Sequence, residues 1–144
     1  MSAIPAIPIT GLDHVVLRVT DLPRSIAFYE EVLGCRVERR VEALGLVQLR
    51  AGASLVDLVD VDSPLGRAGG ESPDRKAGNM DHFALALSDF DETAIREHLA
   101  RHGVKASETA PRYGATGTGP SIYLRDPDGN TVELRVRRPS RSPS

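Results

Sequence analysis

Hydrophobic and polar positions alternate along two similar stretches of the chain. The first reads LDHVVLRVTDL (residues 12–22) and the second reads MDHFALALSDF (residues 80–90). Both alternate as a β-strand with one buried face does. Histidine occupies the same position in each, as His14 and His82. The repeat predicts an internal duplication.

A helix is predicted after each of these strands. In LPRSIAFYEEVLG (residues 22–34), apolar residues recur at helical spacing, Thr20 or Asp21 can cap the start, and Gly34 ends the helix. The residues that define the second helix are its apolar positions Phe90, Ile95 and Leu99, its candidate caps Ser88, Asp89 and Asp91, and its terminal Gly103. Each helix is expected to pack on the apolar face of its strand.

Short strands are predicted after each helix. They are CRVERRVE, GLVQLRAG and SLVDLVDV in the first half, and VKASETA and PSIYLRDPDGNTVELRV, folded about the turn DPDGN, in the second. Each half therefore reads βαβββ, an α+β pattern. The Gly-rich PRYGATGTGP (residues 111–120) is predicted to be a loop at the mouth of a cavity.

The whole chain is predicted to form one domain. We place the first module at residues 11–62, a surface linker at 62–79, the second module at 80–138 and a disordered tail at 138–144. A length of 144 residues, 40% of them hydrophobic, suits a single moderate core.

Charge and cysteine content argue against several classes of function. The net charge of −2 and scattered basic residues argue against nucleic-acid binding. No apolar run approaches the length of a membrane span, and the N-terminus does not resemble a signal peptide, so we expect a cytoplasmic protein with no membrane partner. The one cysteine, Cys35, is interpreted as a core residue rather than a nucleophile.

Two histidines and two carboxylates are expected to share one cavity. His14 and His82 point away from their helices, and Asp57 and Glu133 occupy matching positions in the last strands of the two halves. If the sheets of the halves meet, all four groups are enclosed and need partners, which a divalent cation provides. Nitrogen and oxygen ligands suit Ni, Zn, Co, Mn or Fe(II), and the site would keep positions open for substrate.

The motifs LDHVVLRVTDLPRSIAFYEEVLG, MDHFALAL and IYLRDPDGNTVEL resemble the vicinal oxygen chelate superfamily. This group includes glyoxalase I, fosfomycin thiol transferases, methylmalonyl-CoA epimerase, extradiol dioxygenases and bleomycin resistance proteins. The resemblance covers residues 11–137. It implies two tandem βαβββ modules that form an open, side-mouthed β-barrel, with the helices outside.

The resemblance also implies roles for individual residues. The metal ligands of the family fall on His14, Asp57, His82 and Glu133, although glutamate is usual in place of Asp57. Asp57 therefore binds directly, binds through water, or leaves a three-ligand site. The catalytic proton transfer falls on Glu133 or Asp57. From its place on the face of His14, Arg18 is a candidate to bind an anionic part of the substrate, or else a local pairing partner. Gln48 is a weaker candidate for a hydrogen bond to the substrate or to a site residue, and an exposed strand residue is the favoured interpretation.

The leading functional prediction is a metal-dependent, glyoxalase-I-like lyase or isomerase. Its substrate would be a small α-oxo or hydroxy-carbonyl compound or its thiol adduct, with glutathione as a candidate co-substrate. The alternatives are a metal-free protein that sequesters an antibiotic, as bleomycin resistance proteins do, and a thiol transferase of the fosfomycin-resistance type. We expect a homodimer, because each half-barrel needs a partner from its own chain or from a second one.

Overall fold

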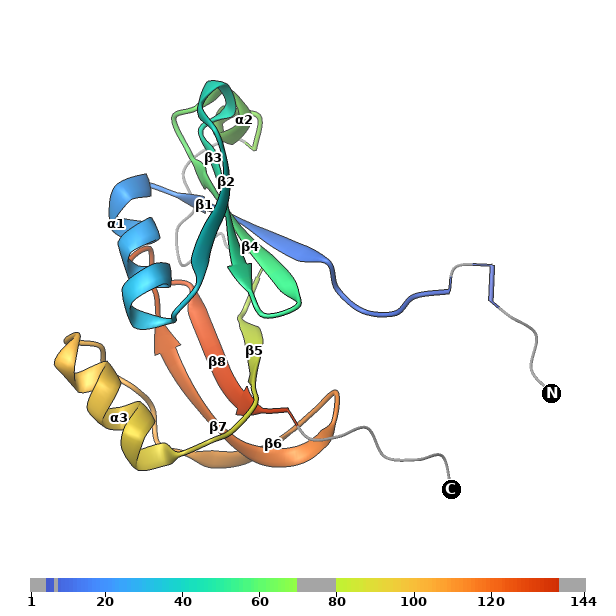
Figure 1. The fold of residues 1–144 in the computed structure, drawn as a ribbon, viewed down its shortest axis with the longest axis vertical. Coiled ribbons are helices and arrows are strands. Elements are labelled where there is room, and N and C mark those ends of the chain that lie inside the picture. The colour runs from blue at the N-terminus through green and yellow to red at the C-terminus, as the bar shows by residue number, and fades with distance from the viewer. Residues whose placement is uncertain (1–4, 7, 70–79, 138–144) are drawn as a thin grey trace.

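Two four-stranded sheets, each with its own helix, make up the molecule (Figure 1). The computed structural model describes residues 5–6, 8–69 and 80–137. The first half contains β1 (His14–Val19), α1 (Leu22–Ala27), the π-helical turn η1 (Phe28–Val32), β2 (Arg36–Val41), the 3-10 turn η2 (Glu42–Leu44), β3 (Leu46–Ala51) and β4 (Ser54–Asp60). The second half contains β5 (Phe83–Leu87), α3 (Glu92–Arg101), β6 (Ala110–Gly114), β7 (Gly117–Arg125) and β8 (Thr131–Val136). The short α2 (Pro64–Arg67) follows β4 in the sequence.

The strand order is the same in both halves, which supports the predicted duplication. The first sheet has the order β1-β4-β3-β2 and the second has the order β5-β8-β7-β6. The first strand of each sheet is parallel to its neighbour, and the other pairs are antiparallel. Among the described residues, no strand of one sheet pairs with a strand of the other. The α+β fold of two βαβββ modules is therefore confirmed, and the barrel is open.

Aspartates cap both long helical segments. Asp21 accepts a hydrogen bond from the backbone of Arg24, and Asp91 accepts one from the backbone of Ala94, each at 3.1 Å. This selects one cap from each set of predicted candidates. It also corrects one boundary, because Phe90 precedes the cap of α3 and packs beside the helix rather than within it.

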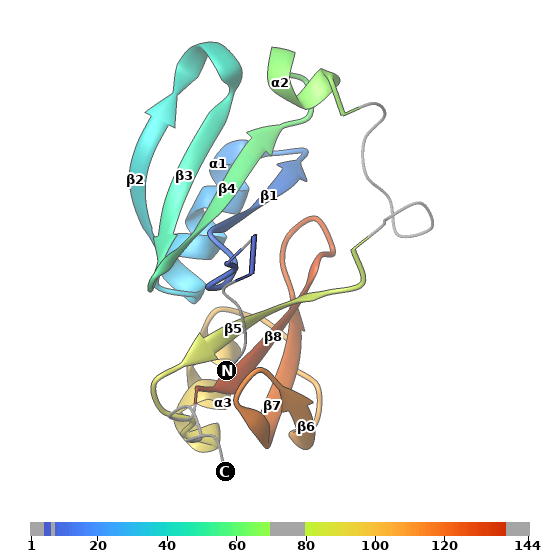
Figure 2. The same ribbon diagram turned by 90° about the vertical axis from the view of Figure 1, so that its right-hand side faces the viewer.

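The core lies between the helices and the sheets. Figure 1 shows α1 and α3 on the same side of the two sheets, and Figure 2 shows the sheets from the opposite side, with the helices behind them. The largest fully buried side chains include Tyr29, Leu58 and Ile122. Cys35 is also buried, as predicted, and burial raises the pKa of its thiol. The helix-free faces of both sheets therefore open on one side of the molecule.

The turn between β7 and β8 joins the halves. As predicted, residues 126–130 form a tight turn, in which Asp126 accepts hydrogen bonds from the backbone of Asn130 at 2.8 Å and Asp128 at 3.0 Å. From the first half, the hydroxyl of Tyr29 donates to Asp126 Oδ2 at 2.8 Å, and that of Thr20 donates to Asp128 Oδ1 at 2.6 Å. These contacts hold the turn against the first half.

Two sequence predictions in the second half are wrong. Residues 104–110 were expected to form a strand, but within this segment the structure has only an isolated bridge from Ala106 to Leu124 before β6 begins at its last residue. Residues 111–120 were expected to form a loop, and instead they form most of the β6–β7 hairpin. Gly114 is needed there for space, because a Cβ on it would lie 2.5 Å from Cζ of Arg135.

The linker is only partly described. Its first part contains α2, which Ser63 caps by accepting a hydrogen bond from the backbone of Gly66 at 3.0 Å. The rest of the linker, residues 70–79, and the predicted tail, residues 138–144, lie outside the described residues. In the part of the chain that is described, no helix has the length and apolar character needed to cross a membrane.

Candidate metal centre

The first candidate pair joins His14 at the start of β1 to Asp57 on β4. His14 Nε2 lies 4.0 Å from Asp57 Oδ2, and the Asp57 side chain is only 4% exposed. On the other edge of the ring, Nδ1 lies 2.8 Å from Asp13 Oδ2. The hydrogen bond with Asp13 and the charge of Asp57 raise the pKa of His14. The ring is thus held with Nε2 toward the buried carboxylate.

One oxygen of Asp57 is held, and the other has no hydrogen-bond partner. Gln48 on β3 donates to Asp57 Oδ2 at 3.0 Å and accepts from Arg39 at 3.2 Å. Asp57 Oδ1 is buried and makes no hydrogen bond with any described residue. A buried acceptor without a partner costs about 1–3 kcal/mol, and more when it is charged. Asp57 is therefore suited to a cation ligand, and Gln48 is a hydrogen-bonding residue of the site rather than an exposed one.

The second candidate pair repeats this arrangement in the other half. His82, just before β5, has Nε2 3.2 Å from Glu133 Oε1, and Nδ1 lies 2.7 Å from Asp81 Oδ2. The second oxygen of Glu133 accepts a hydrogen bond from Arg135 Nη1 at 3.0 Å. Both charged side chains are less than a tenth exposed. Each half thus presents one imidazole nitrogen next to one carboxylate oxygen.

The four candidate ligands have the donor atoms that suit a divalent metal ion, but within one chain they lie in two separate pairs. Neutral imidazole and carboxylate are the ligands expected for Zn, Ni, Co, Mn or Fe(II). The structure brings His14 to Asp57 and His82 to Glu133. Among the described residues of one chain, no three side chains of His, Cys, Asp or Glu come together at a point. The four predicted ligands therefore form two half-sites.

Tyr123 and Arg112 adjoin the second half-site. Tyr123 on β7 is paired with Glu133 in the sheet, and its ring centroid lies 5.2 Å from that of His82. Arg112 on β6 lies over the Tyr123 ring, with Cζ 4.3 Å from the ring centroid. Desolvation and the charge of Glu133 raise the pKa of the Tyr123 hydroxyl. The face therefore carries a cation and an aromatic ring beside the candidate ligands.

Arg18, the predicted substrate-binding residue, is half-buried near the linker. It lies on β1, on the face of His14, as the alternation predicted. Gly69 packs against it, since a Cβ on Gly69 would lie 2.7 Å from Arg18 Nε. Its contact with substrate remains a prediction.

Several site residues were not predicted from the sequence. Asp13 and Asp81 were visible as a repeated Asp-His pair, and that repeat is a signal that could have identified them. Arg135 was assigned no role. Arg112 lay in the segment predicted as a loop, so its strand position could not be inferred.

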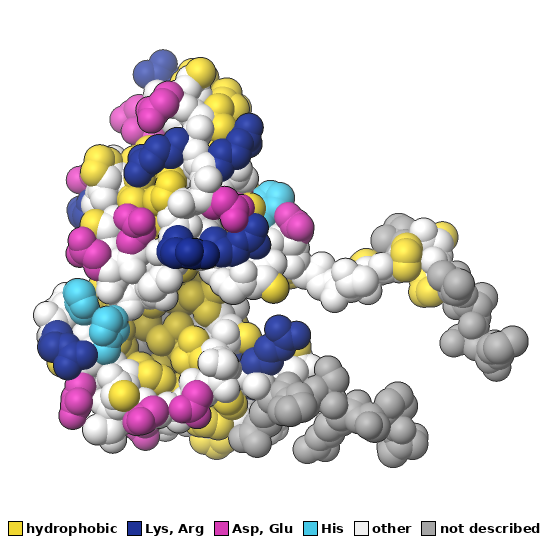
Figure 3. Space-filling view, in the orientation of Figure 1, with side chains coloured by type: hydrophobic (Ala, Val, Ile, Leu, Met, Phe, Trp, Pro, Cys, Tyr) yellow, Lys and Arg dark blue, Asp and Glu magenta, His cyan; other side chains and the backbone are white. Residues whose placement is uncertain are grey.

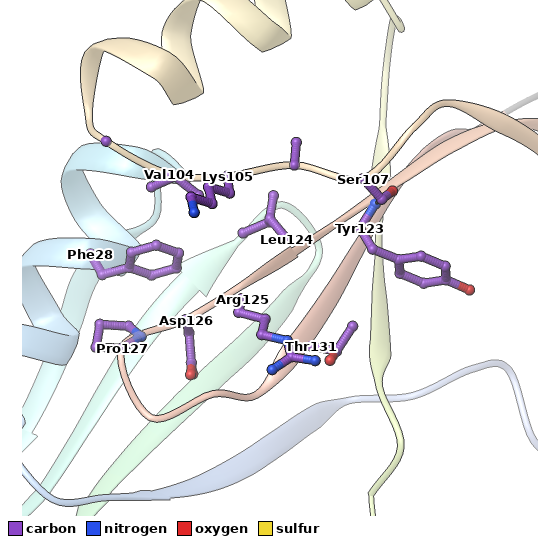
Figure 4. Close-up of a pocket in the computed structure, with 12 residues that line it drawn as sticks. Phe28, Val104, Lys105, Ser107, Tyr123, Leu124, Arg125, Asp126, Pro127 and Thr131 are labelled. Atoms are coloured by element: carbon purple, nitrogen blue, oxygen red, sulfur yellow. The ribbon is translucent and has the colours of Figure 1, made fainter. Parts of the chain in front are cut away.

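Two cavities lie away from the histidine pairs. One, of about 750 Å³, is lined by Phe28, Thr131 and residues 103–107 and 123–127. Figure 4 shows Phe28, Val104 and Leu124 facing one another there, with the Tyr123 ring directed away. Figure 3 shows apolar side chains in a hollow between the two halves, where a cavity of about 290 Å³ is lined by residues of η1, β5 and α3. The residues that line these cavities include none of the four candidate ligands.

Comparison with known proteins agrees with the repeated fold. The family model for the Glyoxalase/Bleomycin resistance protein/Dioxygenase superfamily matches residues 11–134. The chain belongs to this superfamily.

Individual relatives differ in activity. The chain is 30% identical over 131 residues to a catechol-2,3-dioxygenase of Bacillus subtilis, covering 90% of this chain and 42% of the relative. It is 33% identical over 134 residues to lactoylglutathione lyase GLX1 of Arabidopsis thaliana, covering 90% and 45%. The chain thus spans less than half the length of either relative. The structure of integron cassette protein VCH_CASS1 of V. cholerae is similar, with a TM-score of 0.70, 28% identity, and coverage of 92% and 98%.

Proposed function

We propose that this protein is a divalent-metal-dependent lyase or isomerase of the glyoxalase I type that acts as a homodimer. Its substrate would be a small α-oxo or hydroxy-carbonyl compound or the adduct of such a compound with a thiol such as glutathione. The metal would be held by His14 and Asp57 of one protomer together with His82 and Glu133 of its partner.

The observation that carries this proposal is the repeated half-site. In both halves an imidazole Nε2 lies near a carboxylate oxygen, an aspartate lies at the other ring nitrogen, and a neighbouring side chain donates a hydrogen bond to the carboxylate. Such outer contacts are typical of metal-binding histidines and carboxylates. Two ligands per half-site are too few for a stable transition-metal site, which usually has at least three protein ligands. Joining two half-sites supplies four.

The helix-free faces support a second copy of the chain as the partner. Both faces open on the same side of the molecule (Figure 2). Large apolar side chains are exposed around them: Leu12 is 84% exposed, Val16 49% and Met80 44%. Leu12 and Met80 occupy equivalent positions in the two halves, next to the edge strands β1 and β5. Exposed apolar groups at such places are typical of interaction surfaces.

The chemistry follows from the ligand set. A bound divalent cation supplies Lewis-acid stabilisation of negative charge on a substrate oxygen. Asp57 or Glu133 would accept the proton from the carbon next to the carbonyl group and return it to the neighbouring carbon. Gln48 would orient Asp57, and Arg135 would orient Glu133. Arg135 would also keep Glu133 from being an unpaired buried charge.

Metal content measured by plasma mass spectrometry tests this proposal. The experiment uses dialysed, untagged protein after reloading with Ni, Co, Zn, Mn or Fe(II). We expect about one ion per chain, and a His14→Ala/His82→Ala variant should lose it. A His102→Ala variant is the matched control. His102 lies beyond α3, and its one ring contact among the described residues is with His98.

The outcome separates the candidate functions. If the wild type and His102→Ala retain metal and His14→Ala/His82→Ala does not, assays with thiol adducts of α-oxo aldehydes are justified. Wild-type protein that takes up no metal under any loading condition would contradict the proposal. That result would leave ligand sequestration without metal as the function to test.

A further inference from the structure

Arg112 is held rigidly on the helix-free face of the second sheet. Its Nη1 donates to the carbonyl oxygen of Ser121 at 3.0 Å and to the Ser121 hydroxyl at 2.6 Å. Ser121 is fully buried, and the guanidinium lies over the Tyr123 ring, with Cζ 4.3 Å from the centroid. A side chain fixed by both a buried anchor and a stacking contact has already lost much of the entropy that ligand binding costs.

One edge of this guanidinium is open. The hydrogen bonds of Arg112 to described residues all use Nη1, so Nε and Nη2 have none. The Nε and Nη2 donors point in parallel from one edge of the planar group, which is the geometry that binds both oxygens of a carboxylate. Arg112 is half-buried rather than fully exposed. An anion at this edge would therefore be partly protected from water.

The charges on this face favour an anionic ligand. Arg135 is committed to Glu133 and to the carbonyl oxygens of Arg112 and Gly117, at 3.2 and 2.8 Å. The buried carboxylate of Glu133 on this face is thus neutralised by Arg135. Among the described residues, no carboxylate forms an ion pair with Arg112, whose guanidinium lies over the Tyr123 ring.

Arg112 lies within the reach of a small metabolite from the second half-site. Cζ of Arg112 lies 4.3 Å from the centroid of the Tyr123 ring, and the centroid of the His82 imidazole lies 5.2 Å from the same point. We propose that Arg112 binds a carboxylate of the substrate that is remote from the reacting carbonyl group. The protein would then prefer carboxylate-bearing α-oxo compounds. This inference rests on the proposed function, because the carbonyl end must bind at the metal.

A matched pair of probes tests the inference. 2-Oxoglutarate and 2-oxopentanoate have the same chain length and the same chelating end, and differ in the remote carboxylate. Binding of each to the Ni-loaded protein is measured by isothermal titration calorimetry. We expect the wild type to bind 2-oxoglutarate about tenfold more tightly, as one charge-assisted contact provides.

Three variants make the test specific. Arg112→Met should abolish the preference between the probes, and Arg112→Lys should retain part of it, because lysine keeps the charge but lacks the two parallel donors. Arg101→Met is the control, because Arg101 is exposed at the end of α3, and it should behave as the wild type. Metal content and thermal unfolding of every variant verify that the site and the fold are intact.

Each result has a defined meaning. Equal binding of the two probes by the wild type, or an unchanged preference in both Arg112→Met and Arg112→Lys, overturns the role of Arg112 and leaves the metal proposal standing. Failure of the protein to load metal, or failure of both probes to bind to loaded protein, overturns the proposed function and this inference with it.

Discussion

At the scale of single residues, the aspartates before the two histidines are the clearest repeated feature of the candidate site. Asp13 and Asp81 lie 2.8 and 2.7 Å from the Nδ1 atoms of their histidines. A carboxylate on Nδ1 fixes the ring tautomer that presents Nε2 to a metal, and raises the basicity of that nitrogen.

Removing these carboxylates should weaken metal binding without removing it. We expect Asp13→Ala and Asp81→Ala each to lower metal affinity by about tenfold or more. Competition with a chelator measures the affinity. Asp89→Ala, which removes an exposed aspartate beyond β5, is the control. Unchanged affinity in both variants would show that the histidines do not bind metal through Nε2.

Single residues also show which contacts of the site could not be predicted from the sequence. The alternation of polar and apolar positions placed His14, His82, Asp57 and Glu133 on the helix-free faces, because side-chain direction in a strand depends only on parity. It gave Gln48 only as a weaker candidate for a hydrogen bond at the site and assigned no role to Arg135. Such contacts depend on strand register and rotamers, which parity does not determine.

At the scale of elements, the contact between α1 with its turn η1 and the β7–β8 turn holds the halves together. Tyr29 is fully buried there and donates to Asp126, which also accepts from Asn130 Nδ2 at 2.8 Å. Desolvation, followed by the charge of Asp126, strongly raises the pKa of Tyr29. The folded state therefore requires the protonated phenol.

This buried phenol predicts a pH dependence of stability. Below about pH 10, the ordinary pKa of tyrosine, the stabilisation from Tyr29 is complete. Above it, the unfolded chain loses the proton while the folded chain keeps it, so the free energy of unfolding falls by about 1.4 kcal/mol per pH unit.

Tyr29→Phe should lower stability by about 1 kcal/mol at neutral pH and reduce the alkaline loss by the part that Tyr29 contributes. Denaturant unfolding between neutral pH and pH 11 measures both effects. Tyr113→Phe is the control, since Tyr113 is 84% exposed. A Tyr29→Phe variant with the same alkaline slope as the wild type would contradict the account.

The elements themselves were largely predictable. Strand alternation, helical spacing and the caps Asp21 and Asp91 are local signals, and they gave both βαβββ units. The β6–β7 hairpin was missed because its glycines resemble a loop. In the structure, Gly114 leaves room for Arg135, a side chain from a distant strand. This steric requirement involves two residues far apart in the sequence, so it cannot be recognised from a local sequence pattern.

At the scale of the whole molecule, the central claim is that one metal site is built from two chains. One chain holds two half-sites, each an imidazole with a carboxylate, on faces that open on the same side (Figure 2). Sequence alone left open whether the halves meet within a chain or between chains. Because no three of the described His, Cys, Asp or Glu side chains of one chain come together, we propose that the sites are shared between chains.

Metal content of a designed heterodimer tests this claim most directly. One chain carries His14→Ala/Asp57→Ala and the other carries His82→Ala/Glu133→Ala, with different tags so that the mixed dimer can be isolated. Each homodimer should bind no metal. If sites are shared, the heterodimer contains one complete site and one empty one, so it should bind one ion per dimer. A heterodimer without metal, beside a wild type that binds it, would show that each site lies within one chain and would contradict the account.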